Sequence, residues 1–228
     1  RPILQTQISH AVGRQVTIGH LALAWTQPPR LIAEGVRVAS PTDFPPDTPN
    51  WATIARVVAE LDLRPLWRLD PPDIPAADVT SLQVTSVQLP DGLNNFTFIL
   101  PPPGHGTMPR IGAIRLHDSH AQISLHAVGA ELSVDLRTEG EDGNSIIGDL
   151  TGTYAGEAVH GRVTGGPILT LQDATAPYAV DIRLASGSFQ IAIAGTVRDI
   201  FRLGGADLRL DAAGPDLAAI HKLTGLPF

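Results

Sequence analysis

Apolar and polar residues alternate with a period of two along most of the chain, the pattern of β-strands with one buried face. Such segments recur at short spacing between turns rich in proline and glycine, which predicts a mainly β fold of antiparallel strands. A helical period of 3.6 residues occurs near the two ends, over residues 3–12 before Gly13 and from Pro215 to Gly225. We therefore expect a short N-terminal helix and a C-terminal helix beside the sheet.

The alternation slips by one position at glycines in two neighbouring segments. Ile18 and Leu21 are in different phases on either side of Gly19, and the next segment slips in the same way at Gly35. A third slip falls within residues 79–89. A slip of one residue predicts a tight turn or a β-bulge, and bulges curve a sheet. The matched irregularities predict that the first two segments pair as a hairpin.

One stretch divides the chain into two sections. Residues 101–109 contain three consecutive prolines, a fourth at Pro109 and two glycines, which no strand ladder would accommodate. Residues 1–100 then hold the N-terminal helix and a first section of sheet, and residues 110–228 hold a second section that ends in a helix. We expect the two sections to form one continuous domain.

The composition limits the partners. Hydrophobic residues make up 43% of the chain and charged residues only 17%, against roughly 25% charged in an average protein. The net charge of −7 comes without a basic stripe, which argues against a nucleic-acid partner. The chain contains no cysteine and no run of about 18 apolar residues that would span a bilayer.

Catalytic and metal-binding patterns are absent from the sequence. His117, His120 and His126 do not have the spacing of a zinc site. The glycines at 165–166 lack the Lys-Ser/Thr pair of a phosphate-binding loop, and no serine lies in a nucleophile elbow. We therefore expect a protein that is not an enzyme and that uses no metal or cofactor.

The alternation instead predicts one long apolar face, with two possible uses. The face would either contact lipid in an open groove or form a closed core between two packed sheets, and periodicity alone does not distinguish them. The candidate lipid-contact residues are Leu21, Leu23, Val36, Val38, Ile123, Leu125, Leu132, Val134, Ile182, Leu184, Ile191 and Ile193.

Four stretches resemble the bacterial AsmA family. Residues 12–21 (VGRQVTIGHL) resemble the family's helix end, with its Gly-Arg pair, and its first strand. Residues 29–38 (PRLIAEGVRV) resemble the second strand, and residues 52–66, ending in LDLRPL, resemble the third strand and the turn after it. Residues 91–98 (DGLNNFTF) resemble an Asp-Gly-x-x-Asn-Trp-x-Phe run, with Phe96 where tryptophan is common.

The resemblance continues between residues 165 and 227, whereas the prolines of residues 70–90 depart from it. It implies a periplasmic protein tethered to the inner membrane by an N-terminal helix that this sequence lacks. It also implies a repeating β-groove, in which an antiparallel sheet curls into a trough with an apolar inside. The family is linked to outer-membrane integrity and, in its larger members, to bridge-like phospholipid transport.

The resemblance thus implies that the chain handles phospholipid or other lipids between the inner and outer membranes. It brings no catalytic residues with it. The alternative is a scaffold or interaction module for outer-membrane biogenesis that contacts envelope proteins and holds no ligand.

Overall fold

A computed structural model describes residues 9, 13–45, 50–68, 72–97, 111–140, 143–172, 176–198 and 205–214, and the structural statements below concern these residues. The alternating segments form a single twelve-stranded sheet. The strands are β1 (Val16–Ala24), β2 (Arg30–Val38), β3 (Ala52–Glu60), β4 (Ile74–Gln88), β5 (Ile111–His117), β6 (Ser119–Leu125), β7 (Ala130–Glu139), β8 (Ser145–Tyr154), β9 (Glu157–Gly165), β10 (Tyr178–Ser186), β11 (Phe189–Val197) and β12 (Asp207–Ala213).

The mainly β prediction is confirmed, whereas the two predicted helices are not shown. The described residues contain no helix of seven or more residues. They contain three short 3-10 helices, η1 (Arg64–Arg68), η2 (His126–Val128) and η3 (Ile168–Gln172). Apart from Ser9, the predicted N-terminal helix lies outside the described residues, and so does the whole predicted C-terminal helix.

The sheet departs from the predicted antiparallel pattern at β4. Its order is β1-β2-β3-β4-β6-β7-β8-β9-β10-β11-β12, and β5 also pairs with β4. β5 and β6 lie end to end beside the long β4 and run parallel to it, whereas the other pairs are antiparallel. The predicted dividing stretch, residues 101–109, lies outside the described residues, but strands from both sections join in one sheet through β4.

A crease crosses the strands of the first section. The pairs Ile18–Val36 and His20–Glu34 leave one residue of each strand between them, so Gly19 lies opposite Gly35 and no extra residue is inserted. The predicted bulge at this place is therefore wrong, because a bulge sets two residues against one. The crease continues across β3 and β4 and ends between β5 and β6; its residues are Gly19, Gly35, Ala55, Ser81 and Asp118.

Three of the five crease residues have left-handed backbone. Gly35 has φ 61°, Ser81 has φ 54° and Asp118 has φ 48°. Two successive residues of a strand normally face opposite sides of a sheet, yet Ile18 and Leu21 pack in one cluster although they are three positions apart. On each of these strands, the apolar residues before and after the crease therefore face the same side of the sheet. This accounts for the slips in the sequence.

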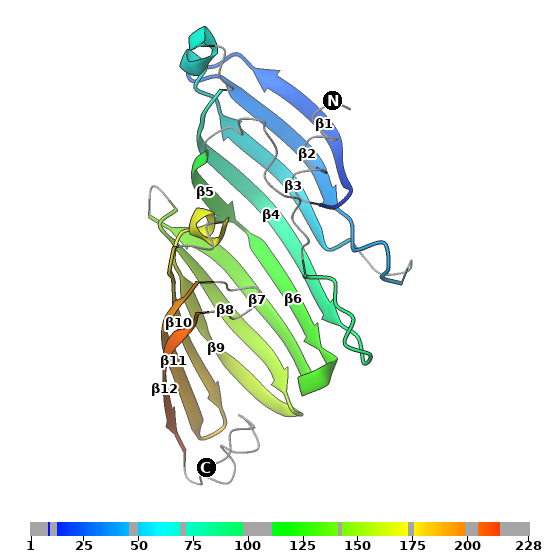
Figure 1. Cartoon of the computed structure of the whole chain (residues 1–228), viewed down its shortest axis with the longest axis vertical. Helices are drawn as coiled ribbons and strands as arrows, with labels where there is room; N and C mark the ends of the chain where they lie inside the picture. Colours follow the sequence, from blue (N-terminus) through cyan, green and yellow to red (C-terminus); the bar gives the residue numbers. More distant parts are fainter. Residues whose placement is uncertain are drawn as a thin grey trace.

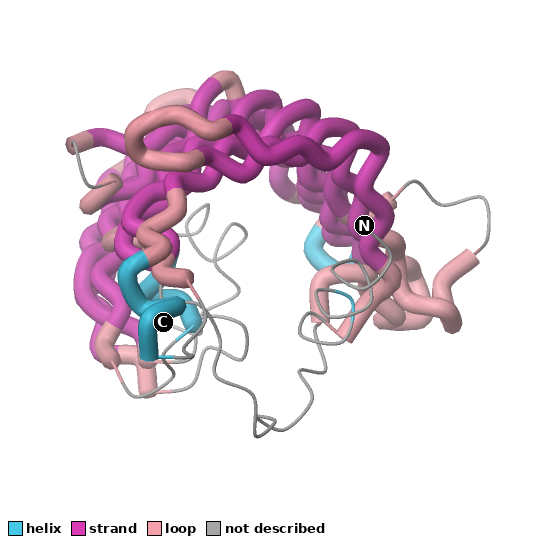
Figure 2. The backbone as a smooth tube through the Cα atoms, turned by 90° about the horizontal axis from the view of Figure 1, so that it is seen from above, coloured by secondary structure: helices cyan, strands magenta, loops and turns pink. Residues whose placement is uncertain are grey.

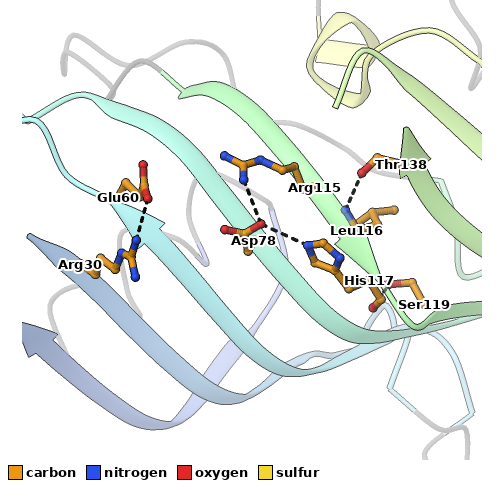
Figure 3. Close-up of polar contacts among 8 residues, drawn as sticks. All are labelled: Arg30, Glu60, Asp78, Arg115, Leu116, His117, Ser119 and Thr138. Atoms are coloured by element: carbon orange, nitrogen blue, oxygen red, sulfur yellow. Dashed lines mark hydrogen bonds and ion pairs between the residues drawn. The ribbon is translucent and has the colours of Figure 1, made fainter. Parts of the chain in front are cut away.

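The crease does not continue into β7, which pairs with β6 and β8 without a slip. The backbone N–H of Leu116 donates to Thr138 Oγ1 at 3.0 Å, and Figure 3 shows this bond between β5 and β7. Because β5 and β7 do not form a backbone ladder, the Thr138 hydroxyl takes the place of a backbone carbonyl as the acceptor for the Leu116 N–H.

The apolar face is the inside of an arch. Figure 2 shows the strands running around the arch and stacking along the long axis of the molecule, with the open side toward the viewer of Figure 1. Figure 3 views the sheet from the opposite, outer side, where Asp78 and Arg115 project. Because neighbours along a strand alternate, Val79 and Leu116 face the concave side. We call this concave side the trough.

Glycines on the concave side alternate with large apolar residues on the neighbouring strands. Gly148 lies between Leu136 and Val163, and Gly161 lies between Leu150 and Leu184. A Cβ atom at Gly148 would lie 2.7 Å from Val134 Cγ1, inside van der Waals contact. Side chains converge on the inside of a curved sheet, so these glycines give space for the bend. The concave glycines of this kind are Gly148, Gly152, Gly161, Gly165 and Gly195.

Candidate functional site

The trough is lined by rows of apolar residues that run across the whole sheet. One row takes a directly paired residue from each of the eleven strands on the sheet path. Its members are Val16, Val38, Ala52, Val84, Ala121, Val134, Leu150, Gly161, Leu184, Ile191 and Ala212. No polar side chain interrupts this row, which runs lengthwise along the trough because the strands run around the arch.

Further parallel rows widen the apolar lining on one side of this row. On this side lie Ile18, Val36, Ile54 and Leu82 in the first section and Leu136, Gly148, Val163, Ile182, Ile193 and Leu210 in the second. Beyond the crease lie Leu21, Ala33, Val57, Val79 and Leu116, followed by Leu23, Leu31, Ala59, Ala77 and Ile114.

All twelve candidate residues from the sequence lie on this concave face. Leu21, Val36 and Val38 belong to a cluster on β1–β3, and Ile123, Leu132, Val134 and Leu184 belong to a second cluster on β4–β10. Ile182, Ile191 and Ile193 continue the face toward β12, Leu23 lies beyond the crease, and Leu125 ends β6.

Alternation alone missed many lining residues in the first section. Ile54 and Leu82 extend the lining across β3 and β4, and Val57 and Val79 do so beyond the crease. Their signal was present in the sequence as apolar alternation on each strand. Assigning them to one face, however, requires the crease, whose members at Ala55 and Ser81 are not glycines.

No second layer covers the trough among the described residues. Their strands all belong to one sheet, so the closed core between two sheets that the sequence left open is not what this part of the chain forms. Leu23, Leu208 and Leu210 keep exposed fractions of 45%, 41% and 42%. Large apolar side chains thus remain exposed at the β1 and β12 ends of the trough, whereas Ala52, Val134 and Leu150 in its middle are buried. Exposed apolar residues at the two ends suit an interaction or ligand surface.

A hollow lies over the strands at the β12 end of the trough. It has a volume of about 360 Å³ and opens over β9 to β12, and its lining includes Gly161, Leu184, Ile191 and Ala212, the last four members of the central row. Arg183, Ala185 and Ala192, which alternate with Leu184 and Ile191 along β10 and β11, also line it.

The outer face carries the ion pairs. Arg137 and Arg162 each donate to Asp149, with Nη1–Oδ2 and Nε–Oδ1 distances of 2.7 Å. These hydrogen bonds, first from Arg137 and then from Arg162, hold the pKa of Asp149 below its ordinary value. The carboxylate therefore stays charged at neutral pH, and this side of the sheet suits water.

A second group of outer-face pairs lies on β2 to β5. Asp78 Oδ1 lies 3.6 Å from Arg115 Nη1 and 3.1 Å from His117 Nε2, and Arg30 bonds Glu60 at 3.1 Å (Figure 3). Pairs this exposed contribute at most about 1 kcal/mol each. Their main consequence is the polarity of the outer face, opposite the apolar trough.

Buried polar side chains fix two places at the margins of the sheet. Asn95, which is 0% exposed, accepts from Val87 N–H at 2.7 Å and donates to the Thr85 carbonyl oxygen at 2.8 Å. Arg14 donates to the Thr97 carbonyl oxygen at 2.9 Å, and its guanidinium lies 5.8 Å from the Trp51 ring centroid. Asn95 thus holds the residues after β4 against the end of that strand. Arg14, just before β1, bonds the same segment at Thr97.

Tyr178, the first residue of β10, fixes the second of these places, at the end of β9. Its hydroxyl donates to the Gly166 carbonyl oxygen at 2.9 Å, and burial raises the pKa of this hydroxyl to about 12. Tyr178 therefore remains neutral, and its ring packs over Gly165 and Gly166.

A comparison with curated proteins connects this architecture to a family. The chain is 36% identical over 75 residues to the AsmA family protein YhjG of Escherichia coli (strain K12). This match supports AsmA family membership over the matched third of the chain. The matched residues are 33% of this chain and 11% of the relative, so the chain spans only a small part of that protein's length.

The AsmA resemblance of the sequence is thereby confirmed, and its motifs now have places in the fold. Residues 12–21 lead into β1, residues 29–38 form β2, and residues 52–66 form β3 and the start of η1. Residues 12–21 and 29–38 contain the first two positions of the crease. No family model matches the chain, and no solved structure matches it either.

Metal-ligating clusters and membrane-spanning helices are both absent from the described part of the chain. Within the described ranges, no three His, Asp or Glu residues are grouped so that they could hold a metal ion. His117 and His120 flank the crease residue Asp118 and bond to different carboxylates, Asp78 and Asp135. None of the helices in the described part of the chain is long and apolar enough to cross a membrane.

Proposed function

We propose that this chain holds the acyl chains of phospholipid or other lipids in the trough, as part of lipid transport between the inner and outer membranes. The observation that supports the proposal is the unbroken apolar row across eleven strands, which no second layer covers in the described structure. At about 4.8 Å between strands, such a row is about 50 Å long.

The energetics of the proposal follow from apolar contact alone. Each methylene of an acyl chain moved from water to an apolar surface contributes about 0.8 kcal/mol, so ten methylenes contribute about 8 kcal/mol. The trough offers few polar groups that would recognise a headgroup. Tolerance of several lipid species is therefore part of the proposal, with the headgroup left at the open side.

The proposal places the chain in the periplasm, tethered to the inner membrane in the full-length protein, with envelope proteins as possible further partners. It assigns no catalysis, cofactor or nucleic acid to the chain. Asp149, Asp78 and their arginine partners lie on the outer face in ion pairs, so these charged groups are turned away from the trough.

Lipid extraction tests this function. The chain would be purified without detergent, extracted with organic solvent and analysed by mass spectrometry, and then mixed with a fluorescent phospholipid. We expect near-stoichiometric phospholipid in the extract and saturable uptake of the fluorescent lipid. Protein that is free of lipid and also ignores the fluorescent phospholipid would favour the scaffold alternative.

A further inference from the structure

Two tryptophans are almost fully exposed at one end of the molecule. Trp25 directly follows β1 and keeps 77% of its surface exposed, and Trp67 in η1 keeps 91%. Tryptophan is on average a highly buried residue, and the chain contains only three. The third, Trp51, packs near the Arg14 guanidinium. The exposure of two of the three tryptophans to water therefore calls for a physical explanation.

The exposed tryptophans lie on neighbouring connections. The Leu61 N–H, just before η1, donates to the Pro29 carbonyl oxygen in the β1–β2 turn at 2.8 Å. Figure 1 shows this turn and the cyan η1 coil together at the top end of the molecule. Leu66 of η1, 49% exposed, adds a further apolar side chain. We call Trp25, Leu66 and Trp67 the tryptophan rim.

The charges around the tryptophan rim are paired and close to neutral in sum. Arg64 bonds Asp62 through two nitrogens, at 2.9 and 2.6 Å, and Arg30 bonds Glu60. The Arg64 side chain is 89% exposed. The rim therefore combines indole rings, which carry both an apolar body and an N–H donor, with an exposed arginine. Indoles of this kind favour the headgroup level of a bilayer.

The tryptophan rim continues the lining of the trough. Leu23, two residues before Trp25, lies on the concave face opposite Leu31 and is 45% exposed. The apolar path along the trough thus reaches the molecular surface beside the exposed indoles.

We propose that the tryptophan rim docks on the surface of a phospholipid bilayer and brings the β1 end of the trough to the boundary between headgroups and acyl chains. The occupant is a zwitterionic lipid surface, because the chain has a net charge of −7 and no basic stripe. Binding then depends on indole insertion and only weakly on anionic lipid.

Vesicle flotation tests the docking. The full chain would be mixed with phosphatidylcholine vesicles, and the fraction that floats compared with that of Trp25→Ser/Trp67→Ser. We expect the double variant to bind at least tenfold more weakly, with unchanged far-UV circular dichroism. The matched control is Val128→Ser, an exposed apolar residue in η2 (43% exposed), which should bind like the parent chain. Brominated phosphatidylcholine should quench the fluorescence of the parent chain.

Three results would overturn the docking proposal. The first is equal flotation of the parent and the double variant. The second is binding that requires anionic vesicles. The third is self-association of the parent that the double variant loses without any vesicle binding, which would assign the rim to a second copy of the chain. Vesicle binding is measured apart from the lipid content of the trough, so failure of one proposal is distinguishable from failure of the other.

Discussion

Replacement of Ile182 and Ile193 together by aspartate is expected to abolish phospholipid uptake while the sheet stays folded. The two residues are direct cross-strand partners on β10 and β11 and belong to the concave face. Each is only half-buried and lies outside the two buried clusters. Two carboxylates there would have to lose water when an acyl chain covers them, at a cost of several kcal/mol.

This cost is comparable to the contribution of several methylenes at about 0.8 kcal/mol each, so uptake should fall at least tenfold. The matched control is Ala179→Asp/Thr196→Asp. It adds the same charges to the same two strands at directly paired positions that alternate with Val180 and Val197, and therefore on the outer face. It should leave uptake unchanged. Equal uptake by both variants, with both folded by circular dichroism, would contradict the assignment of the trough.

Replacement of Gly35 by valine is expected to lower the free energy of unfolding by about 2–3 kcal/mol, because a β-branched residue strongly disfavours left-handed backbone. The cost is conformational rather than steric, since a Cβ atom at Gly35 would approach nothing closer than Gly19 Cα at 3.7 Å. Urea unfolding followed by circular dichroism measures it.

The reverse change is expected at another crease position. Ser81 has φ 54°, so Ser81→Gly relieves left-handed strain of about 1 kcal/mol, partly offset by the greater freedom of glycine in the unfolded chain. We expect a change from zero to a slight stabilisation. A neutral Gly35→Val, or a Ser81→Gly variant as unstable as Gly35→Val, would show that the crease does not hold the strands in this conformation.

The sequence predicts the strands and their apolar phase well, because the period of two is a local property of each strand. The slips at Gly19 and Gly35 were also visible, since glycine interrupts the alternation there. The continuation of the crease was only partly visible. A slip falls within residues 79–89, which contain Ser81, but Ala55 carries no turn signal and Asp118 looked like an ordinary turn between two strands. Its alignment across five strands depends on pairing, which is not local.

The parallel pairing of β4 could not be predicted for a related reason. β4 pairs with β5 and β6 across a long separation in the chain, and nothing in the alternation of either segment specifies the direction of its neighbour. The alternation of apolar and polar residues also did not indicate which way the sheet curves. Gly148 and Gly161 indicate it only after the register places each between large residues on both sides.

Photo-crosslinking along the sheet tests the central claim most directly. A benzophenone amino acid would replace one residue at a time on the concave face, at Val84, Leu132 or Ile191, and on the outer face, at Thr151, Arg162 or Ala179. After irradiation of lipid-loaded protein, mass spectrometry would detect any lipid adduct. We predict adducts from the three concave positions and none from the three outer ones. Adducts at equal yield from both faces, or from the outer face alone, would contradict an acyl-chain path through the trough.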